Sequence, residues 1–307
     1  MTSSKIIQDK LPQKYRQFHD VFRLLDFDEL PPYRVYDHRI KLIPGHRLEP
    51  LPTSSFTEQE TELIRYYICG LVSRGLITSS KAVAASGIYF ESAGAHTVPK
   101  VSFRQLNAST VRASFEHPIP LNIIRSIMNT QVYTKLVIQN VHEQIRLNIN
   151  DAHRTTFSTP FGKHRLTTLP FGLVDATVTI QEMADDIIDS NTRDYVVAYQ
   201  DNILVYSWNA AHHTRHVKHI LNCFRDYSVQ LDIGKCEFDV TEIIFLGYKL
   251  GNGDFTINPV KCKEISEILL PKSKGELKSF IGKVRYWAEF IPDYASKVSS
   301  LSNLTLS

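Results

Sequence analysis

The sequence is poor in cysteine and has no long apolar run. Only four cysteines occur among 307 residues, at positions 69, 223, 236 and 262, and no two of them form a Cys-x-x-Cys pair. This usage argues against a disulfide framework and a cysteine-based zinc site, and it indicates a reducing compartment. No stretch approaches the roughly 18 uninterrupted apolar residues of a membrane span, and the N-terminus has no signal-peptide core. We therefore expect a soluble intracellular protein without a membrane partner.

Strong charge of either sign is also missing. Lys and Arg number 35 against 32 Asp and Glu, which gives a formal charge of +3. This balance is compatible with a local basic groove but does not by itself predict a nucleic-acid partner. The 43% of hydrophobic residues are enough to build a core in one to three compact domains.

The first 50 residues contain one predicted helix and one predicted strand. Residues 11–25 carry apolar side chains at spacings of three and four, which predicts a short amphipathic helix. The Pro31-Pro32 pair forces an extended backbone, and the alternation over residues 33–42 predicts a strand that Pro44-Gly45 closes.

Later segments carry clearer signals. Thr57 and Glu60 have the spacing of a capping box ahead of a periodic apolar run that should stop at Gly75. Short strands are expected over residues 77–119, followed by a helix over 121–128.

The strongest strand signal lies in the second half of the chain. Residues 195–199 and 203–206 are apolar, strand-forming runs separated by a polar turn, which predicts a hairpin. A helix is expected over residues 210–227. From residue 258 onward the pattern is helical only.

A series of short motifs occurs in a fixed order. They are LPPYRVYDH (residues 30–38), VSFRQLN (101–107), YTKLVIQNVHEQIRL (133–147), LPFGL (169–173), YQDNILVYS (199–207), KCEF (235–238) and FLGY (245–248). These stretches resemble the patterns LPPHRPYDH, VDYRxLN, FTKLDLxxGYHQIxI, MPFGL, YLDDILIFS, KCxF and FLGY of the reverse transcriptase of gypsy-class LTR retrotransposons. The resemblance runs from about Leu11 to the C-terminus.

The resemblance implies an α+β fold, a right-hand polymerase with fingers, an RRM-like palm and a helical thumb. The implied ranges are an N-terminal helix and extended arm over 1–50, fingers over 51–125 with a return over 148–170, a palm over 126–147 and 171–257, and a thumb over 258–307. The predicted elements agree, because mixed strands and helices give way to helices alone.

The resemblance also implies a two-Mg²⁺ polymerase site, for which this chain keeps one aspartate of three. Mg²⁺ prefers charged oxygen ligands, and the family supplies three aspartates. Val137 stands at the first position and Asn202 at the third, so Asp201 is the retained catalytic residue and metal ligand. Losing one well-placed electrostatic group commonly costs about 10² to 10³ in rate. We therefore expect weak Mg²⁺ binding and loss of catalysis.

The implied nucleotide pocket has changed as well. It comprises Arg104, His142, Phe171 and Gly172, and His142 replaces a tyrosine of the family. The family's fingers lysines fall on residues 91–93, and its arginine falls on Val98. Because Glu91 would repel a triphosphate, we expect deoxynucleotides to bind poorly.

Other implied sites are retained. The resemblance assigns a primer grip to Phe245, Leu246, Gly247 and Tyr248. It assigns the motif lysine to Lys235, a proton donor to pyrophosphate in active relatives. It assigns phosphate contacts in the thumb to Lys274, Lys278, Lys283 and Arg285. For these thumb cations, a solvated helix that packs its own domain stays open as the alternative.

Two clusters could be mistaken for metal sites. Histidines 212, 213, 216 and 219 have a spacing that can bind zinc, but the family carries histidines at two of these positions, and we favour a solvated helix face. Aspartates 185, 186 and 189 are expected to be surface charges rather than substitute ligands.

Three functions follow. The leading hypothesis is a retrotransposon-derived, reverse transcriptase-like protein that has lost DNA synthesis and keeps binding to an RNA/DNA primer-template. The second is an active RNA-directed DNA polymerase with atypical metal ligands. The third is a non-enzymatic scaffold or an inactive subunit that forms a homo- or heterodimer with another reverse transcriptase.

Overall fold

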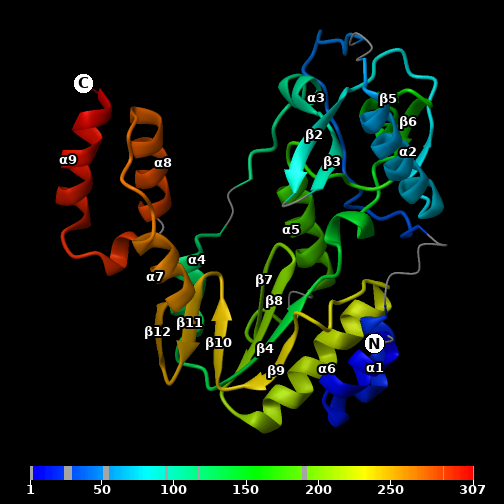
Figure 1. Ribbon diagram of the computed structural model, residues 1–307. Coiled ribbons are helices and arrows are strands. Elements are labelled where there is room, and N and C mark those ends of the chain that lie inside the picture. Colours follow the sequence, from blue (N-terminus) through cyan, green and yellow to red (C-terminus); the bar gives the residue numbers. More distant parts are fainter. Residues whose placement is uncertain are drawn as a thin grey trace.

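Figure 1 shows strands at the base, a mixed lobe above them on one side and a helix pair on the other. The computed structural model describes residues 3–23, 30–50, 55–93, 96–115, 118–188, 192–285 and 287–306. The helices are α1 (Ser3–Lys10), η1 (Gln13–Phe22), α2 (Glu58–Ser73), α3 (Arg104–Ala108), α4 (Pro120–Ile127), η2 (Val141–Gln144), η3 (Ala152–Thr155), α5 (Ala176–Ile187), α6 (Ala210–Asp226), α7 (Pro259–Ser266), α8 (Lys274–Arg285), η5 (Ala288–Phe290) and α9 (Tyr294–Leu306). The strands are β1 (Ile77–Ser79), β2 (Ile88–Ala93), β3 (His96–Val101), β4 (Val132–Val137), β5 (Phe157–Thr159), β6 (Gly162–Leu166), β7 (Val196–Tyr199), β8 (Asn202–Ser207), β9 (Glu237–Val240), β10 (Glu242–Phe245), β11 (Tyr248–Gly251) and β12 (Asp254–Ile257).

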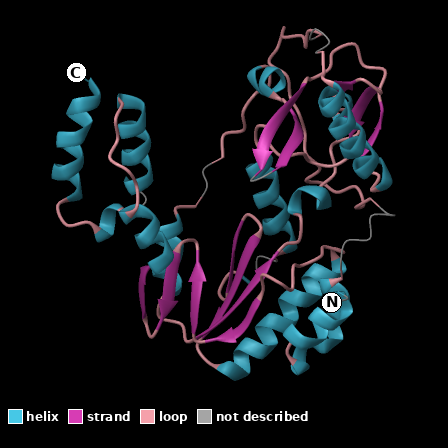
Figure 2. Cartoon of the chain, in the orientation of Figure 1, coloured by secondary structure: helices cyan, strands magenta, loops and turns pink. Residues whose placement is uncertain are grey.

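A four-stranded antiparallel sheet in the order β7-β8-β4-β9 forms the centre of the lower body. Successive side chains along each strand point to opposite faces of the sheet, so the two faces contribute to different cores. Leu136 and Ile203 lie in one apolar cluster with α5 and α6, whereas Tyr133 and Leu204 lie in a second cluster with α4 and the β10-β11-β12 sheet. In Figure 2 the two sheets stand side by side, with α6 and the N-terminal helices to one side.

The helix over 210–227 is confirmed as α6, but its histidines do not form one solvated face. His213 is completely buried. Both ring nitrogens have polar partners, since Nε2 lies 2.8 Å from Thr134 Oγ1 and Nδ1 lies 2.9 Å from Ser207 Oγ. Burial lowers the pKa of His213 to about 4. The prediction of a solvated face is wrong for this histidine, and exposure is found at His212 and His219.

The amphipathic helix predicted over residues 11–25 is wrong in type. The structure has the 3-10 helix η1, whose backbone leaves helical geometry at Phe18. Its apolar positions, Tyr15, Phe18, Val21 and Phe22, are buried as the spacing predicted. The Tyr15 hydroxyl donates to Asp239 Oδ1 at 2.7 Å, so η1 contacts the β9 segment more than 200 residues away. Residues 24 and 25 lie outside the described residues.

The strand predicted over residues 33–42 is also wrong. The chain turns where the Asp37 amide donates to the Arg34 carbonyl at 3.1 Å, and Asp37 Oδ1 accepts from the Arg34 amide at 3.0 Å. Only single bridges form afterwards, from His38 to Leu147 and from Leu42 to Thr110. The arm therefore pairs with other segments through isolated β-bridges and not as a continuous strand.

The upper lobe confirms the capping box of α2. The Thr57 hydroxyl accepts from the Glu60 amide at 3.2 Å and the Glu60 carboxylate accepts from the Thr57 amide at 2.8 Å. Gly75 follows the helix with φ +64, the left-handed conformation that ends helices. The lobe also contains the sheet β1-β6-β5 and the hairpin β2-β3.

The remaining predicted elements have these outcomes. The helix over 121–128 is confirmed as α4, and the hairpin over 195–206 is confirmed as β7 and β8. The sequence did not predict α3, a single helical turn among the short strands. Among the helices of the described part of the chain, none combines the length and apolar character that a membrane crossing needs.

Candidate polymerase site

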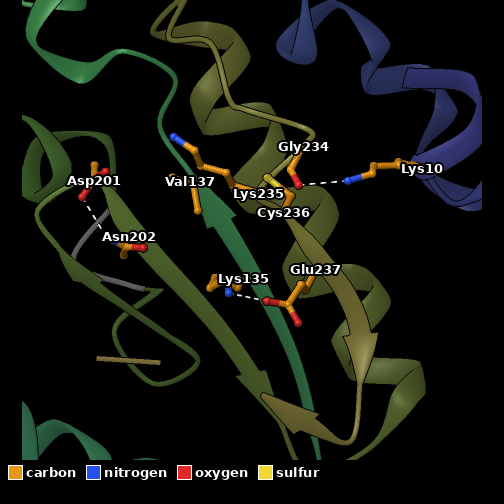
Figure 3. A pocket seen from close by; sticks show the side chains of 9 residues that line it. All are labelled: Lys10, Lys135, Val137, Asp201, Asn202, Gly234, Lys235, Cys236 and Glu237. Atoms are coloured by element: carbon orange, nitrogen blue, oxygen red, sulfur yellow. Dashed lines mark hydrogen bonds and ion pairs between the residues drawn. The ribbon is translucent and has the colours of Figure 1, made fainter. Parts of the chain in front are cut away.

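An open hollow of about 570 Å³ lies where β4, the β7-β8 turn and the segment before β9 meet. Figure 3 shows Asp201 and Asn202 on one side, Gly234, Cys236 and Glu237 on the other, and Val137 between them. The structure thus brings together all three positions that the sequence assigned to metal ligation. Lys235 also lines this hollow.

The strand register explains why Val137 and Asn202 meet. They are Cα partners at the end of the β4-β8 ladder. Val137 is 6% exposed and offers no lone pair. Asn202 Nδ2 donates to Asp201 Oδ1 at 2.8 Å, so the neighbouring amide engages the one retained carboxylate.

Gln181 of α5 holds the hairpin turn that carries Asp201. Its Oε1 accepts from the Gln200 amide at 2.9 Å, and its Nε2 donates to the Ala198 carbonyl at 3.3 Å. Gln200 adopts φ +55, so the turn is left-handed at a non-glycine residue. The sequence did not predict this role, although a glutamine among the apolar positions of residues 176–187 was the available signal.

The lysines near the hollow are already engaged. Lys135 of β4 pairs with Glu237 of β9, and its Nζ lies 3.4 Å from the Ile244 carbonyl. Lys235 Nζ lies 3.4 Å from Asp232 Oδ2, and its side chain is 68% exposed. Lys10 of α1 was not a predicted site residue, and its Nζ donates to the Gly234 carbonyl at 2.9 Å.

The four residues of the predicted nucleotide pocket lie on three segments, α3, η2 and the turn before α5. His142 and Phe171 are in contact, with ring centroids 3.8 Å apart, and Phe171 is 74% exposed. Desolvation lowers the pKa of His142, while the charge of Asp201 and backbone hydrogen bonds oppose the shift. Arg104 is exposed at the start of α3.

Asn107 of α3 fixes the turn that carries Phe171 and Gly172. Its Nδ2 donates to the Gly172 carbonyl at 2.7 Å, and its Oδ1 accepts from the Val174 amide at 2.9 Å. Gly172 adopts φ +86, which a side chain would strain. This clamp connects two of the motifs found in the sequence.

The β2-β3 hairpin carries the altered fingers positions. Glu91 and Val98 are Cα partners across the hairpin. Glu91 is exposed and lies 3.7 Å from Lys100, so a cation of the same hairpin faces the acidic residue. Residues 94 and 95, between β2 and β3 in the sequence, lie outside the described residues.

The predicted primer grip forms the β10-β11 hairpin turn. Leu246 and Gly247 both adopt positive φ, and Tyr248 behind them is 1% exposed. The Tyr248 ring packs edge-on against Trp287, with centroids 5.2 Å apart. This contact connects the predicted grip to the C-terminal helices.

The predicted thumb cations lie on α8. All four are exposed, namely Lys274, Lys278, Lys283 and Arg285. At 100° per residue, Lys274, Lys278 and Arg285 fall within about 40° of one another, and Lys283 falls on the opposite side of the helix.

The donor set does not fit a pair of Mg²⁺ ions. Within the described residues, no group of three or more His, Cys, Asp or Glu side chains is placed to hold a metal. Asp185 and Asp186 are exposed on α5, as predicted, and Asp185 accepts from Gln181 Nε2 at 3.1 Å. Asp189 lies outside the described residues. Asp201 is thus the single anionic candidate at the hairpin turn.

Solved structures show where this arrangement recurs. The foamy viral protease-reverse transcriptase in complex with double-stranded DNA has a TM-score of 0.81 at 15% identity, over 97% of this chain and 52% of that one. The same protein in complex with RNA/DNA hybrid has a TM-score of 0.80 at 15% identity, over 97% and 40%. The fold is therefore the predicted α+β right-hand polymerase fold, whereas the individual domain ranges remain predictions.

Comparison with known sequences points to the same family as the fold. The Transposon Tf2-7 polyprotein of Schizosaccharomyces pombe is 27% identical over 98% of this chain, and Tf2-3 is 26% identical over the same share. This chain spans 23% of the length of these relatives. A family profile described as reverse transcriptase (RNA-dependent DNA polymerase) matches residues 94–250, just over half of the 307 residues. The chain therefore belongs to the reverse transcriptase family.

Proposed function

We propose that this chain is a retrotransposon-derived reverse transcriptase domain that binds primer-template nucleic acid but does not synthesise DNA. One observation carries the proposal: the Asn202 amide donates to Asp201 Oδ1, and Val137 occupies the facing strand position. Two dications need anionic oxygen ligands from both strands of the ladder. Here β4 supplies none, and the carboxylate at the turn already accepts a hydrogen bond.

Retained packing supports nucleic-acid binding. The named solved structures are complexes with double-stranded DNA or RNA/DNA hybrid. This chain has the same overall fold, and its helix α8 carries an exposed cationic face. Such a face binds phosphates through a sequence-independent, salt-sensitive attraction.

Primer extension tests the proposed loss of catalysis. A DNA primer on a homopolymer RNA template would be incubated with Mg²⁺ or Mn²⁺, and the unmodified chain should give no extended product. The matched variant is Val137→Asp combined with Asn202→Asp, which restores both carboxylates at their ladder positions. Fluorescence anisotropy with the same duplex should show binding by both proteins.

Each contrary result points to a specific alternative. Extension that disappears in Asp201→Asn would support an active polymerase with atypical ligands and would overturn the proposed inactivity. Absence of duplex binding at about 50 mM salt would overturn the binding half of the proposal. That result would favour the third hypothesis, a scaffold or an inactive partner subunit. Co-purification with an active reverse transcriptase would identify such a subunit.

A further inference from the structure

Four side chains between α6 and the four-stranded sheet form a continuous polar row, namely Thr134, His213, Ser207 and His216. Thr134 Oγ1 of β4 lies 2.8 Å from His213 Nε2, and Ser207 Oγ of β8 lies 2.9 Å from His213 Nδ1. The same Ser207 Oγ lies 2.9 Å from His216 Nδ1. Thr134, His213 and Ser207 are buried, whereas His216 is half-buried. The polar row therefore leads from the sheet to the surface of α6, which Figure 2 shows beside the sheet.

The inner end of the polar row fixes the direction of its hydrogen bonds. The Asp239 amide donates to Thr134 Oγ1 at 3.0 Å, so this oxygen already accepts one hydrogen bond. Among the described residues, His213 Nε2 is the acceptor within reach of the Thr134 hydroxyl hydrogen. Burying that hydrogen without an acceptor would cost free energy. Because a neutral imidazole carries a single N–H, His213 holds its hydrogen on Nδ1.

The same direction continues along the polar row. His213 Nδ1 donates to Ser207 Oγ, and the Ser207 hydroxyl donates to His216 Nδ1. His216 consequently carries its own hydrogen on Nε2. In this arrangement the hydroxyl hydrogens of Thr134 and Ser207 both have acceptors. The reverse direction would leave the buried Thr134 hydroxyl hydrogen without one.

Acid acts on the outer end of the polar row. A proton added to His216 Nδ1 turns that atom from an acceptor into a donor, so the Ser207 hydroxyl hydrogen loses its acceptor. If the polar row reverses instead, His213 moves its hydrogen to Nε2 and the Thr134 hydroxyl hydrogen loses its acceptor. Either response leaves one buried hydroxyl unsatisfied, so the fold opposes protonation of His216.

The groups that face His216 act in both directions. Burial lowers the pKa of His216, and three groups of α6 lower it further, namely His212, Arg215 and His219. The Tyr195 ring, just ahead of β7, stacks on His216 with centroids 3.8 Å apart. An aromatic face attracts a cation, so this stack favours the protonated imidazole.

At His213 the opposing charge is the carboxylate of Asp239 in β9. Burial lowers the pKa of His213 to about 4, Asp239 raises it, and Lys14 of η1 and the neighbouring His216 lower it. Asp239 Oδ1 accepts from the Tyr15 hydroxyl at 2.7 Å and from Lys14 at 2.9 Å, and it lies 4.0 Å from His213 Nε2. A separation of 4.0 Å is too long for a hydrogen bond, so Asp239 does not take the place of Thr134.

We propose that the polar row acts as one oriented hydrogen-bond relay, which makes the joint between α6 and the sheet sensitive to acid through His216. At neutral pH the relay holds α6 against β4 and β8, and protonation of His216 weakens that contact. None of the four residues lines the hollow beside Asp201, so the relay does not depend on the proposed function. It gives two histidines with metal-site spacing a role that needs no metal ion.

NMR of the chain labelled with ¹⁵N at histidine tests the direction of the relay. At about pH 7.5, where histidine is ordinarily neutral, His213 should be protonated at Nδ1 and His216 at Nε2. The opposite tautomer at either histidine would overturn the proposal. These signals come from the unmodified chain, so the test holds even if a variant of the polar row fails to fold.

The acid response is tested at Ser207. Ser207→Ala removes the donor to His216 Nδ1, so the pH midpoint for protonation of His216 should rise by about one pH unit, a tenfold change in proton affinity. Ser207→Thr keeps the hydroxyl and should leave the midpoint unchanged. An unchanged midpoint in a folded Ser207→Ala would overturn the proposal, and circular dichroism would verify the fold.

Hydrogen exchange tests the effect on the joint. After correction for the intrinsic effect of pH, the amides of α6 in the unmodified chain should lose protection as His216 titrates. The amides of the β10-β11-β12 sheet serve as the internal control and should keep theirs. Equal protection of α6 above and below the midpoint would overturn the proposed sensitivity to acid.

Discussion

At two positions of the hollow, an aliphatic side chain and an amide stand where the family resemblance implies carboxylates. Val137 and Asn202 keep their ladder partners, and the Ile138 amide still donates to the Asp201 carbonyl at 2.9 Å. The motifs indicated that both residues lie beside Asp201, because the two positions fall within motifs whose flanking residues are packing residues. They could not predict that the Asn202 amide engages Asp201, since that contact depends on a side-chain orientation.

The buried His213 should make the protein sensitive to mild acid. Its pKa is about 4 in the folded protein against 6.5 as an ordinary value. Between these values the unfolded chain binds the additional proton, so folding stability falls as the pH drops from about 6.5 to about 4. The full loss is up to about 3 kcal/mol, and urea unfolding at about pH 7 and pH 5 would measure the part that has developed.

A matched pair of variants isolates that contribution. His213→Gln should reduce the difference in stability between the two pH values, whereas the exposed His212→Gln should leave it unchanged. An unchanged difference in the His213 variant would show that another group governs the acid response, and His38 is the next candidate. Burial lowers the pKa of His38 to about 4 as well.

Among the elements, those specified locally could be predicted and those specified by distant contacts could not. The α2 capping box and the β7-β8 hairpin are encoded within a few residues, and both are confirmed. The arm over 33–42 and the helix η1 were predicted wrongly because their partners, such as Leu147 and Asp239, lie more than 100 residues away. Local alternation and periodicity carry no information about such partners.

Gln181 should stabilise the β7-β8 hairpin more than its neighbours on α5 do. Gln181→Leu leaves the Gln200 amide and the Ala198 carbonyl without their side-chain partner, at a cost of about 1–3 kcal/mol in unfolding free energy. Chemical denaturation would measure this loss. Glu182→Gln, an exposed change on the same helix, is the control and should cost less than about 0.5 kcal/mol. Equal stability of the two variants would contradict the clamp.

Across the whole molecule, the site is composed of segments far apart in the chain. The hollow joins α1, β4, the β7-β8 turn and the segment before β9, and the contact from Lys10 to Gly234 spans 224 residues. The motifs indicated that Val137, Asp201 and Asn202 share one site, because a family resemblance supplies long-range pairing indirectly. Lys10 lies outside the motifs, so sequence reasoning missed it.

Trp287 should couple the C-terminal helices to the lower body. It is 7% exposed and packs against Tyr248, which in turn contacts Phe255 and Phe290. Trp287→Ala should cost about 3–5 kcal/mol of stability and make α8 and α9 more susceptible to limited proteolysis. Trp208→Ala removes an indole that is 63% exposed and should have little effect. Equal proteolysis of both variants would argue against this coupling.

The geometry of α8 makes a directional prediction about duplex binding. If Lys274, Lys278 and Arg285 contact phosphates from one face, replacing any one by alanine should weaken binding equally for all sequences. It should also reduce the slope of log K against log salt concentration by about 1. Lys283→Ala removes the same charge from the opposite side and should change the slope by less. Anisotropy titrations across a salt series would measure these slopes. Equal slope changes in all four variants would mean that net charge, rather than one helix face, attracts the duplex.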